Sequence, residues 1–188
     1  MLFRSKEIEE DTKEDFFFIQ QNSTEKILQE VISLSTGRLE KFGNYDFFKN
    51  IQVLTPTKKG PLGTRELNKA LQNVLNPNID ELPEKANGEA IFRVGDRIMQ
   101  IKNNYDITWE KENNQKQEYN IGGYKIPQKP EIGTGVFNGE MGTILEIDEK
   151  EKVIKIQFDD EKIAWYGFTE LEQIEHSYAI TIHKAQRK

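Results

Sequence analysis

A glycine-containing loop beside two lysines could bind phosphate. Lys58 and Lys59 precede residues 60–64, which read Gly-Pro-Leu-Gly-Thr and lead into a predicted helix. Backbone amides at the start of a helix, together with two ammonium groups, can bind a nucleic-acid phosphate. The alternative is an ordinary strand-to-helix turn with solvated lysines. Judged by this loop alone, the ordinary turn is favoured over phosphate binding. A Walker A loop is excluded, because the sequence nowhere has glycine, four residues and then Gly-Lys-Ser/Thr.

A second candidate for phosphate binding lies near the end of the sequence. The apolar residues 178–180 run directly into Thr181, and His183 and Lys184 follow. A hydroxyl, an imidazole and an ammonium group at the end of a strand can each donate to a phosphate oxygen. A core strand that continues into a polar loop explains the same pattern equally well.

Other chemistry finds little support in the residue types. The sequence has no cysteine, which excludes disulfides, thiolate nucleophiles and cysteine-bound zinc. His176 and His183 lack organised carboxylate partners, so neither a zinc site nor a Ser-His-Asp arrangement is predicted. We therefore expect no metal site and no catalytic residue in this chain.

Local patterns predict the elements that carry the two candidate phosphate sites. Apolar runs predict short buried strands at 16–19 and 51–54, and helical spacing predicts a helix that Asn22 caps and Gly37 ends. A second helix is predicted over 64–75, with Thr64 as its N-cap and Asn76-Pro77 as its stop. Strand, loop and helix in this order are typical of an α/β layer.

The second half of the sequence has the patterns of a small all-β unit. Strands are predicted at 98–101, 143–147, 153–158 and 162–166, and their short turns favour an SH3-like antiparallel barrel. Residues 78–89 are predicted to be a surface connection. Residues from about 107 to 135 lose periodicity and are predicted to form a long mobile loop.

Size and charge limit the class of protein. The chain has 188 residues, 36% of them hydrophobic, and a net charge of −6. Its length suits one domain or one and a half. It has no apolar run long enough for a bilayer span, which predicts no membrane contact and a cytoplasmic location. Lysine and arginine predominate in 56–72 and after 176, whereas acids predominate in 136–175, so the acidic middle has the character of an insertion.

Five segments taken in order resemble the carboxyl-terminal part of RecD-like (RecD/TraA-type) DNA helicases of superfamily 1. They are 53–77 with Gly60 and Gly63, 94–106, 136–142, 158–160 and 178–186. The resemblance covers about residues 16–186. It implies a motor that uses ATP and Mg²⁺ to move 5′ to 3′ along single-stranded DNA.

The resemblance also implies a division of the chain into α/β and all-β parts. Residues 1–50 would be the tail of the first motor domain or a linker. Residues 51–92 and 173–188 would be an incomplete second RecA-like motor domain, and 93–172 an inserted SH3-like barrel. The expected partners are single-stranded DNA and the first motor domain of the parent chain.

Individual residues acquire roles only through this resemblance. Those expected on the DNA side come from three segments: Thr55, Pro56, Lys58 and Lys59; Asn103 and Tyr105; and Thr181, His183 and Lys184. Tyr105 would stack on a base. Gln186 would lie at the edge of the nucleotide cleft.

The sequence departs from the family where ATP chemistry is concerned. It lacks the phosphate loop, the Mg²⁺-binding acids and the arginine of motif VI, and Arg187-Lys188 stands where the family continues Gly-Ser-Glu. We therefore expect no cofactor in this chain and no ATP turnover by it alone. An alternative from another class is a protein-interaction module, in which the acidic SH3-like barrel recruits a protein partner.

Overall fold

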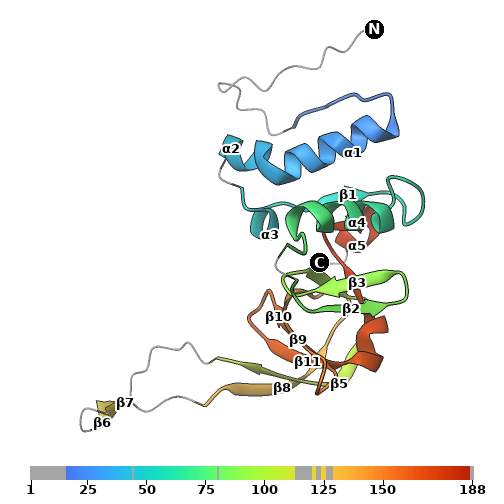
Figure 1. Ribbon diagram of the computed structural model, residues 1–188. Helices are drawn as coiled ribbons and strands as arrows, with labels where there is room; N and C mark the ends of the chain where they lie inside the picture. Colours follow the sequence, from blue (N-terminus) through green and yellow to red (C-terminus); the bar gives the residue numbers. More distant parts are fainter. Residues whose placement is uncertain are drawn as a thin grey trace.

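The computed structural model describes residues 16–43, 45–79, 81–112, 120–121, 124–125 and 129–186. For 120–121 and 124–125 only the backbone is described. It is a mixed α/β structure, with helices at one end and a large antiparallel sheet at the other (Figure 1). None of the described helices combines the length and the apolar character that a membrane span requires.

The helical end is built around a parallel pair of strands. β1 (Val53–Thr55) pairs with β13 (Ala179–Thr181), with Val53 opposite Ala179 and Thr55 opposite Thr181. The helices of this end are α1 (Thr24–Ser33), the π-helical turn η1 (Leu34–Arg38), α2 (Leu39–Gly43), α3 (Phe47–Asn50), α4 (Thr64–Leu75) and α5 (Ile182–Ala185). Parallel strands need a crossover connection. Here that connection is long, because it contains the entire antiparallel sheet.

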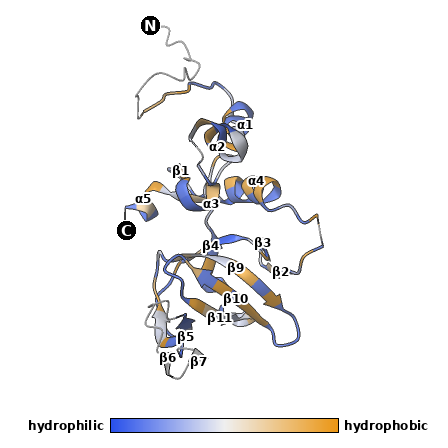
Figure 2. Cartoon of the chain, turned by 90° about the vertical axis from the view of Figure 1, so that its left-hand side faces the viewer, coloured by the Kyte–Doolittle hydropathy of each residue, from blue (hydrophilic) through white to orange (hydrophobic). Residues whose placement is uncertain are grey.

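Helix α4 forms where its sequence pattern predicts, and it covers the strand pair. Leu67 and Leu71 are buried against Tyr178 and Ala179 in one apolar cluster. Figure 2 shows hydrophobic and hydrophilic residues on different sides of this helix. Gly63 occupies the N-cap position, so Thr64 is the first helical residue rather than the cap.

The large sheet has seven strands in the order β12-β4-β9-β10-β11-β5-β8. Its strands in chain order are β4 (Arg97–Gln100), β5 (Asn104–Lys111), β8 (Glu131–Val136), β9 (Met141–Asp148), β10 (Val153–Phe158), β11 (Ile163–Gly167) and β12 (Ile174–His176). Within the described ranges β8 and β12 end the sheet, and no pairing between them closes a barrel. The short hairpins β2 (Glu84–Asn87) with β3 (Ala90–Arg93), and β6 (Asn120–Ile121) with β7 (Tyr124–Lys125), stand apart from it.

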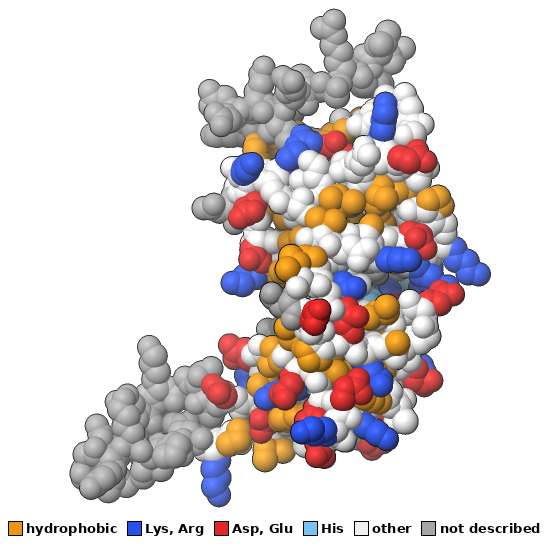
Figure 3. All heavy atoms as spheres, viewed as in Figure 1, with side chains coloured by type: hydrophobic (Ala, Val, Ile, Leu, Met, Phe, Trp, Pro, Cys, Tyr) orange, Lys and Arg blue, Asp and Glu red, His pale blue; other side chains and the backbone are white. Residues whose placement is uncertain are grey.

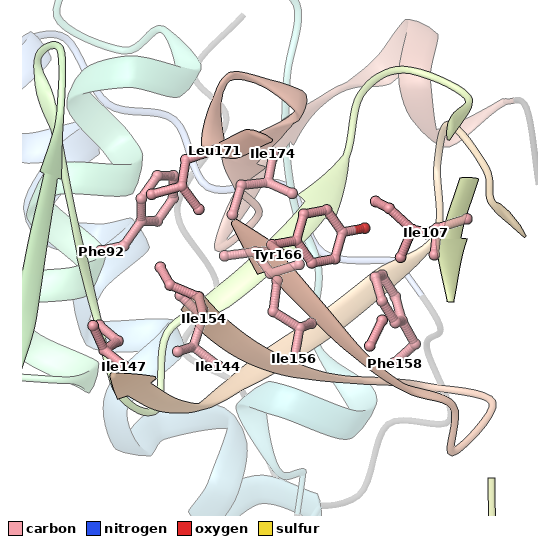
Figure 4. Packing of buried hydrophobic residues seen from close by; sticks show 13 residues of the cluster. Phe92, Ile107, Ile144, Ile147, Ile154, Ile156, Phe158, Tyr166, Leu171 and Ile174 are labelled. Carbon is pink, nitrogen blue, oxygen red and sulfur yellow. The ribbon is translucent and has the colours of Figure 1, made fainter. Parts of the chain in front are cut away.

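Alternation along β10 builds the core of this sheet. Ile154, Ile156 and Phe158 are buried, whereas Gln157 between them is exposed. Figure 4 shows their side chains directed toward Tyr166 and Ile174, which come from β11 and β12. The 3-10 helix η2 (Phe168–Gln173) adds Leu171 to the same cluster. The strands therefore have one face packed in the core and one face toward solvent, as the sequence predicts, and the packed face stabilises the sheet.

Several predictions from the sequence were wrong. Residues 16–19 form no strand, and Phe16 and Phe18 are largely exposed. Ser23, rather than Asn22, caps α1, since its hydroxyl accepts from the Lys26 amide. The predicted connection at 78–89 contains strand β2.

The predicted mobile loop over 107–135 is also wrong at both of its ends. These belong to β5 and β8, which pair with each other and project from the rest of the sheet (Figure 1). Residues 113–119, 122–123 and 126–128 of that predicted loop lie outside the described residues. A polar sequence that lacks alternation can still pair when its neighbour strand supplies the hydrogen bonds.

Candidate nucleic-acid interface

The loop after β1 is held in one compact shape by its own hydrogen bonds. The Thr55 hydroxyl donates to the Leu62 carbonyl at 2.7 Å, and the Thr64 amide donates to the Thr57 carbonyl at 3.1 Å. A Cβ at Gly63 would lie 2.7 Å from the carbonyl carbon and oxygen of Lys58, so only glycine allows this close approach. The loop therefore places the exposed Lys58 and Lys59 on a fixed backbone.

The two candidate phosphate segments meet at one edge of the strand pair. Thr55 and Thr181 are register partners, and both are the last residues of their strands. Thr181 is nearly buried and precedes α5, which carries His183, exposed, and Lys184, half-buried. Ligands of open α/β sheets bind at the carboxyl ends of parallel strands. Segments 124 residues apart in the sequence, counted from Thr57 to Thr181, thus lie at the same edge.

A single carboxylate joins the lysines of these two segments. Glu175 of β12 lies 3.7 Å from the Lys58 Nζ and 3.2 Å from the Lys184 Nζ, measured from its two carboxylate oxygens. The cluster therefore contains two positive charges and one negative charge. An exposed ion pair contributes roughly 0–1 kcal/mol, so the Lys58 ammonium group, with 56% of its side chain exposed, remains available to another anion. The Lys184 side chain is 20% exposed.

Tyr105 of β5 and Phe137, which follows β8, form an exposed pair of aromatic rings. The rings of Tyr105 and Phe137 are 5.7 Å apart at 75°, an edge-to-face contact, and the two side chains are 66% and 42% exposed. Asn103 fixes the neighbouring turn, because its Oδ1 accepts from the Asn138 amide at 2.9 Å. Phe137 belongs to the segment 136–142 that carries part of the family resemblance, yet the sequence alone assigned it no role.

Apolar packing connects the short segment between β4 and β5 to β13 and α5. Ile101, just before Lys102 and Asn103, packs with Ile180 of β13 and Ala185 of α5 around Met99. Gln186 is exposed at the end of α5. Ile101 and Ala185 of α5 thus share one cluster, and Pro56, His183 and Gln186 all remain accessible. Whether these residues contact DNA or nucleotide stays a prediction.

A groove lies between α4, the β2–β3 hairpin and β12. Its volume is about 780 Å³, and Lys58, Lys69, Arg93 and Glu175 are among the charged residues that line it. Figure 3 shows this side of the molecule hollowed between the helical end and the sheet, with charged side chains at the rim. Its mixed charge distinguishes the groove from a purely basic channel.

A buried carboxylate forms the junction between the two ends of the molecule. Asp96, fully buried, accepts from Gln72 Nε2 at 2.7 Å, from Asn76 Nδ2 at 2.7 Å and from the Tyr178 hydroxyl at 2.9 Å. The Arg93 amide also donates to it, at 2.7 Å, and His176 Nε2 lies 3.0 Å away. A buried charge requires such partners. Sequence periodicity gave no sign of this network, because its members come from separate elements.

The junction also changes the acidity of Tyr178. Burial raises the pKa of its hydroxyl, and the charge of Asp96 and the hydrogen bond to Asp96 raise it further. Asn68 adds a second contact nearby, since its side-chain amide donates to the Ala179 carbonyl at 3.0 Å and accepts from the Ala179 amide at 2.7 Å. These contacts hold β13 firmly against α4.

The comparison with protein families decides which all-β unit this is. Residues 67–158 match the family described as ATP-dependent RecD-like DNA helicase SH3 domain. The chain carries a RecD-like helicase SH3 domain. The matched range of this RecD-like domain begins within α4 and ends with β10, so it includes Gln72, Asn76 and Asp96 of the junction.

Curated relatives extend beyond the RecD-like SH3 domain. An ATP-dependent RecD2 DNA helicase of Deinococcus radiodurans is 33% identical over 136 residues, which is 72% of this chain and 14% of that protein. The uncharacterized protein MJ1519 of Methanocaldococcus jannaschii is 30% identical over 176 residues, 88% of this chain and 13% of that protein. The chain thus spans about one seventh of the length of these relatives.

Solved structures similar to the chain include Pif1 helicases. One, from a study of DNA unwinding at forked double-stranded DNA by two Pif1 helicases, has 15% identity and a TM-score of 0.32, covering 91% of this chain and 40% of that one. Unliganded Pif1 from Bacteroides sp has 14% identity and a TM-score of 0.31, covering 74% and 44%.

Proposed function

We propose that this chain is the part of a RecD-like superfamily 1 DNA helicase that holds single-stranded DNA. In this proposal β1, α4, β13 and α5 belong to the second RecA-like motor domain, and the SH3-like sheet is inserted into it. ATP and Mg²⁺ act elsewhere in the parent enzyme, which moves 5′ to 3′. The chain itself contributes contacts to the DNA backbone and bases.

One observation supports this function best. The register pairing of Thr55 with Thr181 brings Lys58 and Lys184 to the same carboxylate, so two basic segments distant in sequence form one cluster. Lysine ammonium groups bind nucleic acid by neutralising backbone phosphates, and this cluster holds two of them at one edge of the strand pair. The exposed Tyr105–Phe137 pair would add stacking on a base.

The alternative, a protein-interaction module on the acidic sheet, makes a different prediction for the lysines. If the sheet only recruits a protein, the cluster of Lys58 and Lys184 has no reason to respond to DNA. Their charges would then matter no more than those of any other exposed lysine pair.

Titration of a fluorescent 15-nucleotide oligo-dT at 50 and 200 mM salt tests the proposal. We expect weak, sequence-indifferent and salt-sensitive binding, which Lys58→Ala with Lys184→Ala weakens about tenfold or more at low salt. The control pair Lys41→Ala and Lys150→Ala removes the same charge from exposed positions and should change binding less than threefold. Equal effects of both pairs, or a strong sequence preference, would contradict the proposed function.

A further inference from the structure

Glu175 is placed where the proposed DNA phosphate would be. Its carboxylate contacts Lys58 of the loop after β1 and Lys184 of α5, at 3.7 and 3.2 Å. These two lysines belong to segments, distant in the sequence, that the β1–β13 pair brings together. An anion between two ammonium groups is the arrangement that a backbone phosphate would also adopt.

The backbone that carries Glu175 is held within the sheet. Glu175 pairs with Met99 in the sheet, and its neighbour His176 lies against Asp96 and accepts from Asn68 through its carbonyl at 3.1 Å. By contrast, Lys58 has 56% of its side chain exposed. The Glu175 side chain is itself 45% exposed, so this pair can separate and the Lys58 side chain can turn toward another anion.

The charges of this cluster favour exchange over permanent pairing. One carboxylate leaves the two ammonium groups with a residual charge of about +1, which still attracts phosphate. The nearby Glu172 pairs with Lys102 at 2.8 Å, and that hydrogen bond lowers the pKa of Glu172. Glu175, which contacts both lysines, therefore opposes phosphate binding at this position while it keeps them together.

We propose that Glu175 is an internal substitute for DNA phosphate that limits how tightly the chain holds single-stranded DNA. Without DNA it positions Lys58 and Lys184 side by side. When a phosphate binds, the two lysines exchange their ion pairs with Glu175 for ion pairs with the phosphate. When the phosphate dissociates, the ion pairs with Glu175 form again. This inference rests on the proposed function and adds to it a residue that promotes release of the strand.

Neutralising Glu175 while retaining its shape tests the inference. Glu175→Gln should bind the oligo-dT about three- to tenfold more tightly than the wild-type chain at 50 mM salt, with a smaller gain at 200 mM, because a repulsive charge near the phosphate is lost. The matched control Glu151→Gln, an exposed acid in the β9–β10 turn, should change the affinity less than twofold. Glu175→Thr, which suits a strand, should give the same gain.

Adding Lys58→Ala and Lys184→Ala to Glu175→Gln separates the possible outcomes. Loss of the gain in this triple variant supports the inference. Persistence of the gain overturns it, because the carboxylate then acts at long range rather than through these lysines. Unchanged or weaker binding by Glu175→Gln and Glu175→Thr, in a chain whose binding still depends on both lysines, overturns the inference and leaves the proposed function standing. Indifference of the wild-type chain to both lysines overturns the proposed function as well.

Discussion

The Tyr178 hydroxyl donates to the Asp96 carboxylate at 2.9 Å, and both side chains are fully buried. Tyr178 precedes β13 at the helical end, whereas Asp96 precedes β4 of the large sheet. This hydrogen bond therefore joins the two ends of the molecule through its interior. Gln72 and Asn76 of α4 contact the same carboxylate, so a helix, a strand and the sheet depend on one charged residue.

Replacing Asp96 by asparagine should destabilise the folded chain. An asparagine keeps the size of the side chain but places an amide donor among donors, so we expect a loss of about 2–4 kcal/mol in the free energy of unfolding. Urea denaturation measures this loss. Asp106→Asn, at an exposed position in β5, should change stability by less than about 0.5 kcal/mol, as surface substitutions generally do. Equal stability of the two variants would refute the structural role of Asp96.

Tyr166 and Tyr178 should resist ionisation in the folded chain. Burial raises the pKa of Tyr166, with the charges of Glu140 and Glu170 adding to the effect, and burial beside Asp96 raises that of Tyr178. An unfolded tyrosine loses its proton near pH 10, so above that pH the unfolded state binds fewer protons than the folded state. The stability present below pH 10 should therefore fall as pH rises further.

Ultraviolet absorbance near 295 nm during an alkaline titration checks this prediction. The two phenols should ionise only together with unfolding, which circular dichroism follows in the same samples. Tyr178→Phe should remove one of the late-ionising groups and leave Tyr166 as the other. Titration of all phenols near pH 10 without loss of structure would show that neither hydroxyl is protected.

Removing either ring of the exposed aromatic pair should weaken DNA binding. Stacking contributes about 1–3 kcal/mol per base, so Tyr105→Ala or Phe137→Ala should reduce oligo-dT affinity about five- to hundredfold with little change in the salt slope. Tyr45→Ala, which removes an aromatic side chain 42% exposed on the helical end, serves as the control and should have no effect. Fluorescence anisotropy measures both. A change in salt slope alone would indicate that the pair does not stack on bases.

Adding a methyl group to Gly63 should disturb the loop that carries Lys58. The new Cβ of Gly63→Ala would lie 2.7 Å from the Lys58 carbonyl, so backbone must move, at a cost of about 1–3 kcal/mol. DNA binding should weaken in parallel, because the lysines lose their fixed backbone. Gly37→Ala is the matched control, since its Cβ meets nothing within 4 Å. Thermal unfolding and anisotropy together should separate the two variants, and equal behaviour would contradict the close approach.

The sequence predicted elements whose pattern agrees with their final packing. Leu67 and Leu71 lie on the packed face of α4, and Ile154 and Ile156 alternate along β10, so local periodicity was enough. The prediction for residues 16–19 was wrong because a short apolar run needs a neighbouring strand, and none of the described strands pairs with it. The β5–β8 pair was missed because its residues alternate poorly, and pairing is set by a partner distant in the chain.

The candidate site was predictable in its parts but not in its assembly. Residue types pointed to Lys58, Thr181 and Lys184 separately, each with an ordinary structural explanation. Their proximity follows from the pairing of β1 with β13, which local pattern cannot reveal. Glu175 lies in an acidic segment where one more acid is unremarkable, and Asp96, although within the segment 94–106 of the family resemblance, was assigned no role of its own. Their importance arises from which distant side chains they touch.

Because Thr55 pairs with Thr181 in parallel strands, the residues between β1 and β13 form one insertion that starts and ends at the same place in the fold. The path leaves the helical end after α4 and returns to it through β12, beside its own starting point. Residues added to or removed from the projecting β5–β8 arm consequently leave the spacing of Lys58 and Lys184 untouched. The β5–β8 pair can thus change in length while the edge that carries Thr55 and Thr181 keeps its dimensions.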